Sequence, residues 1–235
     1  MLKTKLKLED KQKTPSKQRI REIIKKPKDK FLTKSQKEYW NVLDENQITL
    51  CFGPAGVGKS FIAMKKAVDL LYEDDNKYEK IIIVRPAVEA GENLGSLPGD
   101  LQEKLDPYIY PSYYLLNKII GKEAREILKE EGFVEICALA YMRGWNVDNT
   151  ILIFEEAQNA TPTQMKLLLT RIGYNSKFFI SGDLEQSDKY KDKTKSGLYD
   201  AKERLKNVNG IGIFEFHMRD IVRNPIITEI LEKYD

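Results

Sequence analysis

The chain has 235 residues, of which 39 are Lys or Arg and 36 are Asp or Glu, with two Cys and one His. This length is typical of one domain, alone or with a short appendage. A hydrophobic share of 41% excludes wholly disordered, collagen-like and disulfide-scaffold chains. A single His excludes metal sites built on two or three His. No apolar run reaches the roughly 20 residues of a membrane span, and we expect no signal peptide.

The N-terminal segment is strongly basic. Residues 1–30 carry 12 Lys or Arg and 4 Asp or Glu, a net charge of +8, so the whole-chain charge of +3 leaves −5 for residues 31–235. We therefore predict a basic N-terminal arm over 1–30 and one domain over 31–235. Basic arms bind nucleic acid by releasing counterions, and the alternative is a solvated tail that keeps the protein soluble. Residues 16–26 favour a short helix with a narrow docking stripe of Ile20, Ile23 and Ile24.

After residue 35 the pattern becomes regular, and apolar runs alternate with helical stretches. The runs have the continuous apolar character of strands covered on both faces of a parallel sheet. This alternation predicts a three-layer α/β domain with a mainly parallel sheet and right-handed crossovers. The predicted strands are 48–53, 80–85, 133–137, 150–154, 177–181 and 211–216. The predicted helices are about 59–75, 97–106, 111–131, 162–172, 196–206 and 225–233.

Residues 53–60 read GPAGVGKS, which is the G-x-x-x-x-G-K-[ST] pattern between a predicted strand and a predicted helix. Its glycines let successive backbone N–H groups point at one anion, and the helix N-terminus adds positive charge. Lys59 is expected to reach the β- and γ-phosphates of a nucleoside triphosphate, and the Ser60 hydroxyl to bind Mg²⁺. The predicted nucleotide-binding residues here are Gly53, Pro54, Ala55, Gly56, Val57, Gly58, Lys59, Ser60 and Phe61.

Acidic residues follow the strand at 150–154. The first of them, Glu155, is expected to hold Mg²⁺, and Glu156 to orient or deprotonate the attacking water. The alternative is that both acids cap the helix that follows. Glu155 stands where Asp is usual, and its extra methylene alters the metal geometry.

A polar segment follows the strand at 177–181. Gln186 in this segment is suited to contact the γ-phosphate and report its hydrolysis, although GDLEQ by itself is also a turn signal. NKYE at 76–79 faintly resembles a guanine-reading motif, but it precedes the second strand and its last acid is wrong, so we exclude a GTPase.

These motifs occur in the order and spacing of a known family. The blocks RPAVEAGENLGSLPGD (85–100), YMRGWNVDNTILIFEEAQNATPTQMKLLLTRIGYNSKFFISGDLEQSD (141–188) and HMRDIVRNPII (217–227) resemble the PhoH family of P-loop ATPases, including its short phage versions. The resemblance covers roughly residues 33–232. It implies a RecA-like fold, ATP and Mg²⁺ as cofactors, and action on RNA.

The resemblance also implies roles for single residues. Gln36 sits where related helicase cores read the adenine edge, with Tyr39 able to stack or pack nearby. Arg223 matches an expected family arginine and is a candidate catalytic residue, with Asn224 where the family commonly has His. Arg85 and Arg143 are candidates for nucleic-acid or subunit contact, the alternative being pairing with an acid.

The function expected from these observations is ATP hydrolysis coupled to binding, remodelling or unwinding of RNA or another nucleic acid. The alternatives are a nucleotide-gated binding module with little hydrolysis and, less favoured, a ribonuclease-associated activity. Related helicases close ATP between two cores, whereas this length holds one, so we expect a head-to-tail ring of identical subunits, a hexamer. Two isolated Cys favour a reducing compartment, and we expect the cytoplasm, that of the bacterial host if the protein is phage-encoded.

Overall fold

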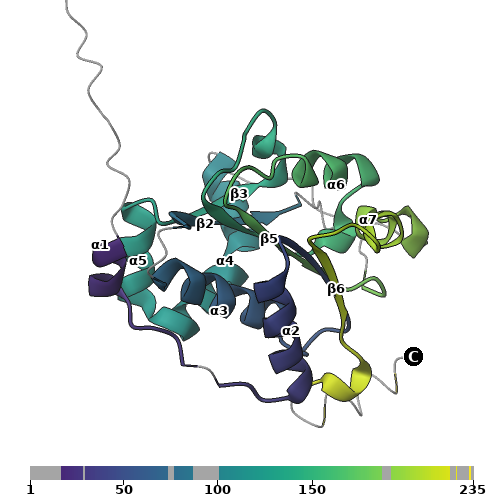
Figure 1. Ribbon diagram of the computed structural model, residues 1–235, viewed down its shortest axis with the longest axis horizontal. Helices are drawn as coiled ribbons and strands as arrows, with labels where there is room; N and C mark the ends of the chain where they lie inside the picture. Colours follow the sequence, from purple (N-terminus) through teal and green to yellow (C-terminus); the bar gives the residue numbers. More distant parts are fainter. Residues whose placement is uncertain are drawn as a thin grey trace, which may run out of the picture.

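The computed structural model describes residues 17–28, 30–73, 77–86, 101–186, 192–222, 226 and 233, with the backbone alone for 101–108. At its centre is a six-stranded sheet in the order β3-β2-β4-β5-β1-β6, in which all neighbouring strands are parallel (Figure 1). The six predicted strands are confirmed to within one residue at each end. They are β1 (Ile48–Phe52), β2 (Lys80–Arg85), β3 (Val134–Ala138), β4 (Thr150–Phe154), β5 (Lys177–Gly182) and β6 (Ile211–Glu215).

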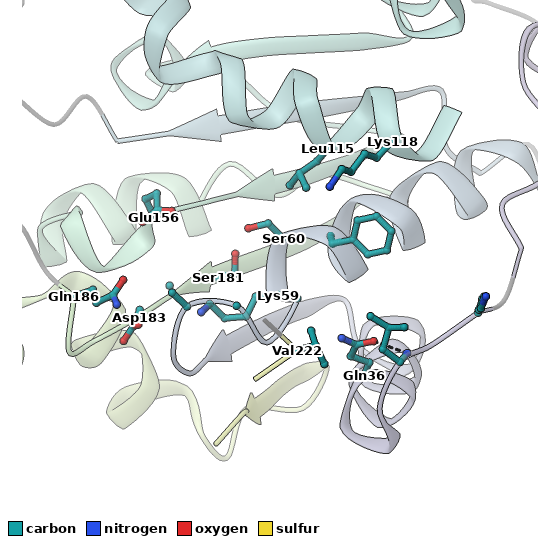
Figure 2. A pocket seen from close by; sticks show the side chains of 17 residues that line it. Gln36, Lys59, Ser60, Leu115, Lys118, Glu156, Ser181, Asp183, Gln186 and Val222 are labelled. Carbon is teal, nitrogen blue, oxygen red and sulfur yellow. Dashed lines mark hydrogen bonds between the residues drawn. The ribbon is translucent and has the colours of Figure 1, made fainter. Parts of the chain in front are cut away.

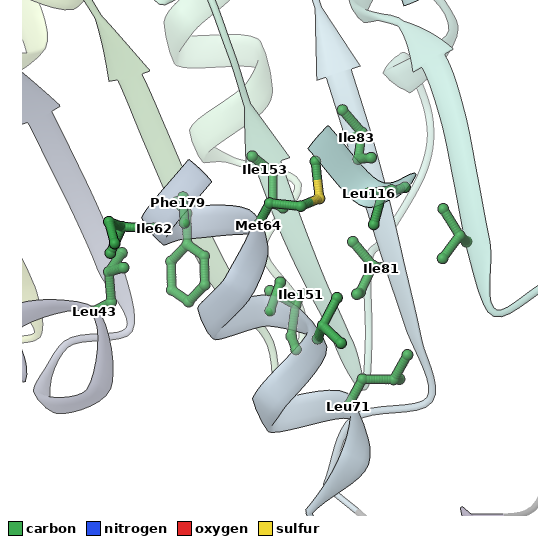
Figure 3. Close-up of a cluster of buried hydrophobic side chains, with 14 of the residues drawn as sticks. Leu43, Ile62, Met64, Leu71, Ile81, Ile83, Leu116, Ile151, Ile153 and Phe179 are labelled. Atoms are coloured by element: carbon green, nitrogen blue, oxygen red, sulfur yellow. The ribbon is translucent and has the colours of Figure 1, made fainter. Parts of the chain in front are cut away.

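Both faces of the sheet are covered, which explains the continuous apolar runs. Successive side chains of a strand point to opposite faces. Thus Ile151 and Ile153 of β4 belong to one buried cluster, and Leu152 and Phe154 belong to another on the opposite face. Figure 3 shows the first cluster, where the side chains of the strands meet those of the covering helices. The predicted three-layer α/β architecture is therefore confirmed.

The helices divide between the two faces (Figure 1). One face carries α1 (Lys17–Ile23), α2 (Lys34–Glu45), α3 (Lys59–Tyr72), α4 (Leu101–Ile120) and α5 (Lys122–Glu130). The other face carries α6 (Pro162–Leu169) and α7 (Gly197–Leu205). Of the predicted helix at 225–233, only residues 226 and 233 are described, and both are helical.

The helix boundaries predicted between β2 and β3 are wrong. A gap was expected between 106 and 111, but α4 continues through Pro107 and Pro111. A buried face with helical spacing, formed by Ile109, Ser112 and Leu116, favours the continuous helix despite the backbone hydrogen bonds that proline removes. The break comes instead at Gly121, whose φ of 88° is a conformation that glycine adopts easily.

The second half of the basic segment packs against the body of the domain. Ile20 and Ile24 are buried in the cluster that covers α3, and Ile23 packs on it. Lys17 donates a hydrogen bond to the Leu71 carbonyl at 2.9 Å. Arg19 forms an ion pair with Glu131 next to α5. The isoleucine stripe predicted for this segment is therefore a docking surface, and it contacts α3 and α5.

The buried Lys177 connects the start of β5 to the C-terminal end of α2, the helix that carries Gln36. Its ammonium donates to the carbonyls of Leu43, Asp44 and Asn46 at 3.0, 2.5 and 2.7 Å. Lys177→Met is expected to lower the free energy of unfolding by about 2–4 kcal/mol, because buried carbonyls lose a charged donor. Chemical denaturation measures the loss.

Lys80→Met is the matched control, because Lys80 begins the β2 strand but forms a half-exposed ion pair with Glu135. A loss below about 1 kcal/mol is expected there. Burial also lowers the pKa of Lys177 to about 8. The unfolded state then binds more protons between about pH 8 and 10.4, so this group makes stability rise with pH over that interval. Equal stability curves for wild type and Lys177→Met would contradict this account.

Candidate functional site

The strand order places the predicted motifs side by side. The adjacent strands β2, β4, β5 and β1 are all parallel, so their carboxyl ends meet at one edge of the sheet. In chain terms, β1 leads into the loop at 53–58, β4 into Glu155 and Glu156, and β5 into Asp183. Crevices beyond the carboxyl ends of parallel strands are the usual ligand sites of open α/β sheets.

A cavity of about 650 Å³ opens at this edge of the sheet (Figure 2). Glu156 and Gln186 lie at one end of it, Lys59 and Ser60 in the middle, and Gln36 at the opposite end. The cavity is lined by Lys30, Leu32, Gln36, Ala55, Gly56, Gly58, Lys59, Ser60, Phe61, Leu115, Lys118, Glu156, Ser181, Gly182, Asp183, Gln186 and Val222.

The loop at 53–58 has a backbone that its glycines make possible. Gly53 has a φ of 139°, and a Cβ added there would lie 2.7 Å from the Cβ of Phe216. Gly58 has a φ of 97° and directly precedes α3. The N-terminal N–H groups of α3 therefore begin at the cavity, where their partial positive charge attracts an anion.

Lys59 lies within this loop. Its ammonium donates to the carbonyls of Gly53 and Pro54 at 2.5 and 2.8 Å, while the side chain also lines the cavity. Ser60 lines the cavity next to it. A point charge held among loop carbonyls at the N-terminus of a helix suits contact with phosphate oxygens.

Gln36 is held firmly at the far end of the cavity. Its Oε1 accepts from the Leu32 N–H at 2.9 Å, and its Nε2 donates to the Val57 carbonyl at 3.0 Å. The side chain thereby connects α2 to the loop at 53–58. Tyr39 does not reach the cavity but is fully buried against Phe214, with ring centroids 5.3 Å apart. It packs rather than stacks on a ligand.

Glu156 points its carboxylate into the cavity, opposite Lys59 (Figure 2). Its backbone is in the left-handed region with a φ of 54°, which is uncommon for a residue with a side chain. Gln158 donates to its Oε2 at 2.8 Å and so holds one carboxylate oxygen in place. Strained backbone of this kind concentrates at functional sites.

Glu155 has a different environment. It is fully buried, and its Oε2 accepts from Arg85 Nη2 at 3.0 Å and from Ser112 Oγ at 2.6 Å. Its Oε1 has no hydrogen-bond partner within the described part of the chain. Glu155 is not among the cavity-lining residues, and its role as a metal ligand stays a prediction. Arg85 pairs with this acid, which is the alternative considered for it.

Some predicted residues lie elsewhere. Arg143 is exposed and follows β3, outside the residues that line the cavity. Arg223 and Asn224 lie outside the described residues. Gln186 lines the cavity and is exposed.

The motif search missed Asp183, which lines the cavity and is 8% exposed. Its N–H donates to Gln158 Oε1 at 3.2 Å, and its Oδ1 accepts from the Glu185 N–H at 3.1 Å. Gln158 therefore bridges the segments that follow β4 and β5. The signal that identifies Asp183 is its place directly after a buried strand, as at Glu155.

These residues fit a nucleoside triphosphate with Mg²⁺. A cavity of about 650 Å³ is within the usual range for small-molecule sites, and the glycine loop and helix N-terminus supply N–H donors. Within the described residues, no group of three His, Cys, Asp or Glu side chains could hold a metal by itself. Mg²⁺ bound to phosphates needs only one or two protein ligands, which Ser60 and a neighbouring acid can supply.

Protein-family comparison matches residues 30–235 to the family described as PhoH-like protein. The chain belongs to the PhoH-like family. A PhoH-like protein of Bacillus subtilis (strain 168) is 48% identical over 217 residues, which is 91% of this chain and 67% of that protein. Protein PhoH of Escherichia coli (strain K12) is 38% identical over 202 residues, 85% of this chain and 56% of that protein. The chain thus spans little more than half to two thirds of these relatives.

Among solved structures, the large terminase of a thermophilic bacteriophage matches over 88% of this PhoH-like chain and 51% of its own, with a TM-score of 0.50 and 11% identity. Together with the parallel six-stranded sheet, this likeness confirms the predicted RecA-like P-loop fold. No helix among the described residues is long and apolar enough to cross a membrane.

Proposed function

We propose that this PhoH-like protein binds ATP with Mg²⁺ and hydrolyses it, and that hydrolysis is coupled to binding or remodelling of nucleic acid, RNA in the first place. One observation carries the ATPase part of the proposal. The glycine loop with Lys59, the carboxylate of Glu156 and the amide of Gln186 converge on one cavity from three separate segments.

The cavity assigns a role to each end. The N–H groups of the loop and the Lys59 ammonium bind the phosphates, which places the terminal phosphate toward Glu156 and Gln186. Glu156 accepts a proton from the attacking water and aligns it, while Gln186 contacts the terminal phosphate. Gln36 faces the adenine end. Mg²⁺, when bound by Ser60 with Glu155 or a neighbouring acid, neutralises charge on the phosphates.

Arg223 is proposed to neutralise charge in the transition state, from the same subunit or from a neighbour. Arginines in this role contribute about 10³–10⁵ in rate in other phosphoryl-transfer enzymes. The proposed assembly is a closed head-to-tail hexamer, because one RecA-like core supplies only one wall of a site that related ATPases close between two cores. A cytoplasmic location is proposed with it.

The nucleic-acid part of the proposal is supported by the charge distribution. A net charge of +8 in residues 1–30 faces a polyanion favourably, whereas the remaining chain is acidic overall. Arg85, one of the two arginines first considered for this contact, pairs with the buried Glu155 instead. Arg143 is exposed and remains a candidate.

Phosphate release with and without single-stranded RNA tests the function, with native mass spectrometry of the same sample. We expect Mg²⁺-dependent hydrolysis that RNA stimulates several-fold, and a mass of six subunits. A fully active monomer would contradict the ring. Hydrolysis that no polynucleotide stimulates would contradict the coupling.

A second function is favoured by one observation. The Oε2 of Glu155 accepts hydrogen bonds from both Arg85 and Ser112, so this oxygen is engaged by protein rather than available to a metal. A nucleotide-gated binding module that hydrolyses ATP slowly fits this arrangement. Binding of ATP with negligible phosphate release, in the presence and absence of RNA, would support it over the ATPase.

A further inference from the structure

A second cavity of about 530 Å³ adjoins the first one. Lys30, Leu32, Phe61 and Lys118 line both cavities, so the two are neighbours at the Gln36 end and not at the Glu156 end. We call it the lysine groove. It is lined by Lys25, Lys26, Pro27, Lys28, Lys30, Leu32, Phe61, Lys65, Lys118 and Ile119.

The lysine groove carries a large uncompensated positive charge. Within the described part of the chain, no carboxylate forms an ion pair with Lys25, Lys28, Lys30 or Lys118. Lys26 differs, because it pairs with Glu73 at 2.5 Å. Like charges gathered in one concave site repel one another and attract an anion strongly.

The groove is formed by folded structure. Ile24 and Pro27 are buried, and the Lys26 ion pair fastens the same stretch to the end of α3. The buried Lys65 donates to the Lys30 carbonyl at 3.2 Å and lies 4.6 Å from the ring centroid of Phe31. The lysines from the N-terminal segment are therefore held opposite those of α3 and α4.

These lysines are not needed for the triphosphate. The phosphate-binding loop and Glu156 lie in the middle and at the far end of the first cavity, whereas the groove adjoins the end where Gln36 lies. Lys25 and Lys28 line the groove alone. A separate anion must therefore account for them.

The chemistry of the groove favours a polymer with bases. The 12 Lys and Arg of residues 1–30 exceed what one small anion requires. Phe61, Pro27 and Ile119 add apolar surface between the charges. Lys118 lies 4.6 Å from the ring centroid of the exposed Tyr114. Lysines for the backbone together with apolar and aromatic surface for the bases are typical of single-strand binding sites.

We propose that the lysine groove binds the phosphodiester backbone of single-stranded nucleic acid, beside the adenine end of the nucleotide site. The proposal rests on the proposed function only for its link to ATP. Because Lys30 and Lys118 line both cavities, the strand and the nucleotide contact common residues. Each anion then changes the affinity for the other, which is reciprocal coupling through shared groups.

The test uses the full chain and a short fluorescent oligouridylate, without hydrolysis. The variant Lys25→Ala/Lys28→Ala changes only residues of the groove. We expect its Kd for the strand to rise roughly tenfold, and the slope of log K against log[salt] to become shallower by about 1.4, or 0.7 for each lost contact. The control Lys37→Ala/Lys166→Ala removes two exposed lysines outside both cavities, and we expect a smaller change.

Binding of a fluorescent ATP analogue is measured on the same variants and is expected to be unchanged by Lys25→Ala/Lys28→Ala. Strand binding equal to that of the control variant would overturn the proposal. So would weaker ATP binding with normal strand binding, since the groove would then belong to the nucleotide. A change only in self-association would assign the groove to a neighbouring subunit and also overturn it. If ATP is never hydrolysed but the strand data hold, the proposed function fails and the groove stands.

Discussion

Glu156→Gln is expected to lower the rate of ATP hydrolysis by about 10²–10⁴-fold while ATP binding stays within a few-fold of wild type. The amide keeps the size and polarity of the side chain but cannot accept a proton from water. Glu156 lines the cavity opposite Lys59, and Gln158 already holds one of its oxygens. Single-turnover phosphate release and equilibrium ATP binding measure the two effects separately.

Glu185→Gln is the matched control, because Glu185 is exposed, follows the neighbouring strand and pairs with Lys193 outside the cavity. Its hydrolysis rate is expected to remain near that of wild type. Full turnover in Glu156→Gln would remove Glu156 from the proposed role. Asp183, the nearest other acid that lines the cavity, would then be the residue to test.

Lys59→Ala is expected to reduce hydrolysis by at least about 10²–10³-fold, because a donor to the transferring phosphate is lost. Unlike Glu156→Gln, it is also expected to weaken ATP binding. The Lys59 ammonium contacts the Gly53 and Pro54 carbonyls, so its loss also leaves the loop without these hydrogen bonds. Steady-state phosphate release and ATP titration measure both losses.

The fold should survive this change, because Lys59 is only partly buried and its partners face the cavity. Lys37→Ala, on the exposed side of α2, is the control for loss of a lysine without loss of the site. Unchanged hydrolysis in Lys59→Ala would contradict the nucleotide site itself, whereas a lowered melting temperature would point to the loop instead.

Local patterns in the sequence predicted much of this molecule. The strands were identified to within a residue because both faces of the sheet are buried, which demands continuous apolar runs. The loop at 53–60 was identified because its glycines and Lys59 act through backbone geometry that only a few adjacent residues determine. Glu156 was found for the same reason, as a residue directly after a buried strand.

Contacts between distant segments decided the rest. Continuity of α4 through Pro111 depends on burial of its Ser112 face, which no local propensity reports. The pairing of Arg85 with Glu155 joins residues 70 positions apart. The lysines of the N-terminal segment read as a solvated arm until Ile20 and its neighbours dock on α3.

The sequence by itself determined the fold class and the phosphate-binding loop, because periodic burial and backbone conformation are encoded within short stretches of chain. Tertiary structure alone decided which charges meet. The strand order aligns Glu156 and Asp183 across one cavity, and the docked segment turns Lys25 and Lys28 toward α4. Electrostatic interactions depend on distance in space, so their partners emerge only once the chain is folded.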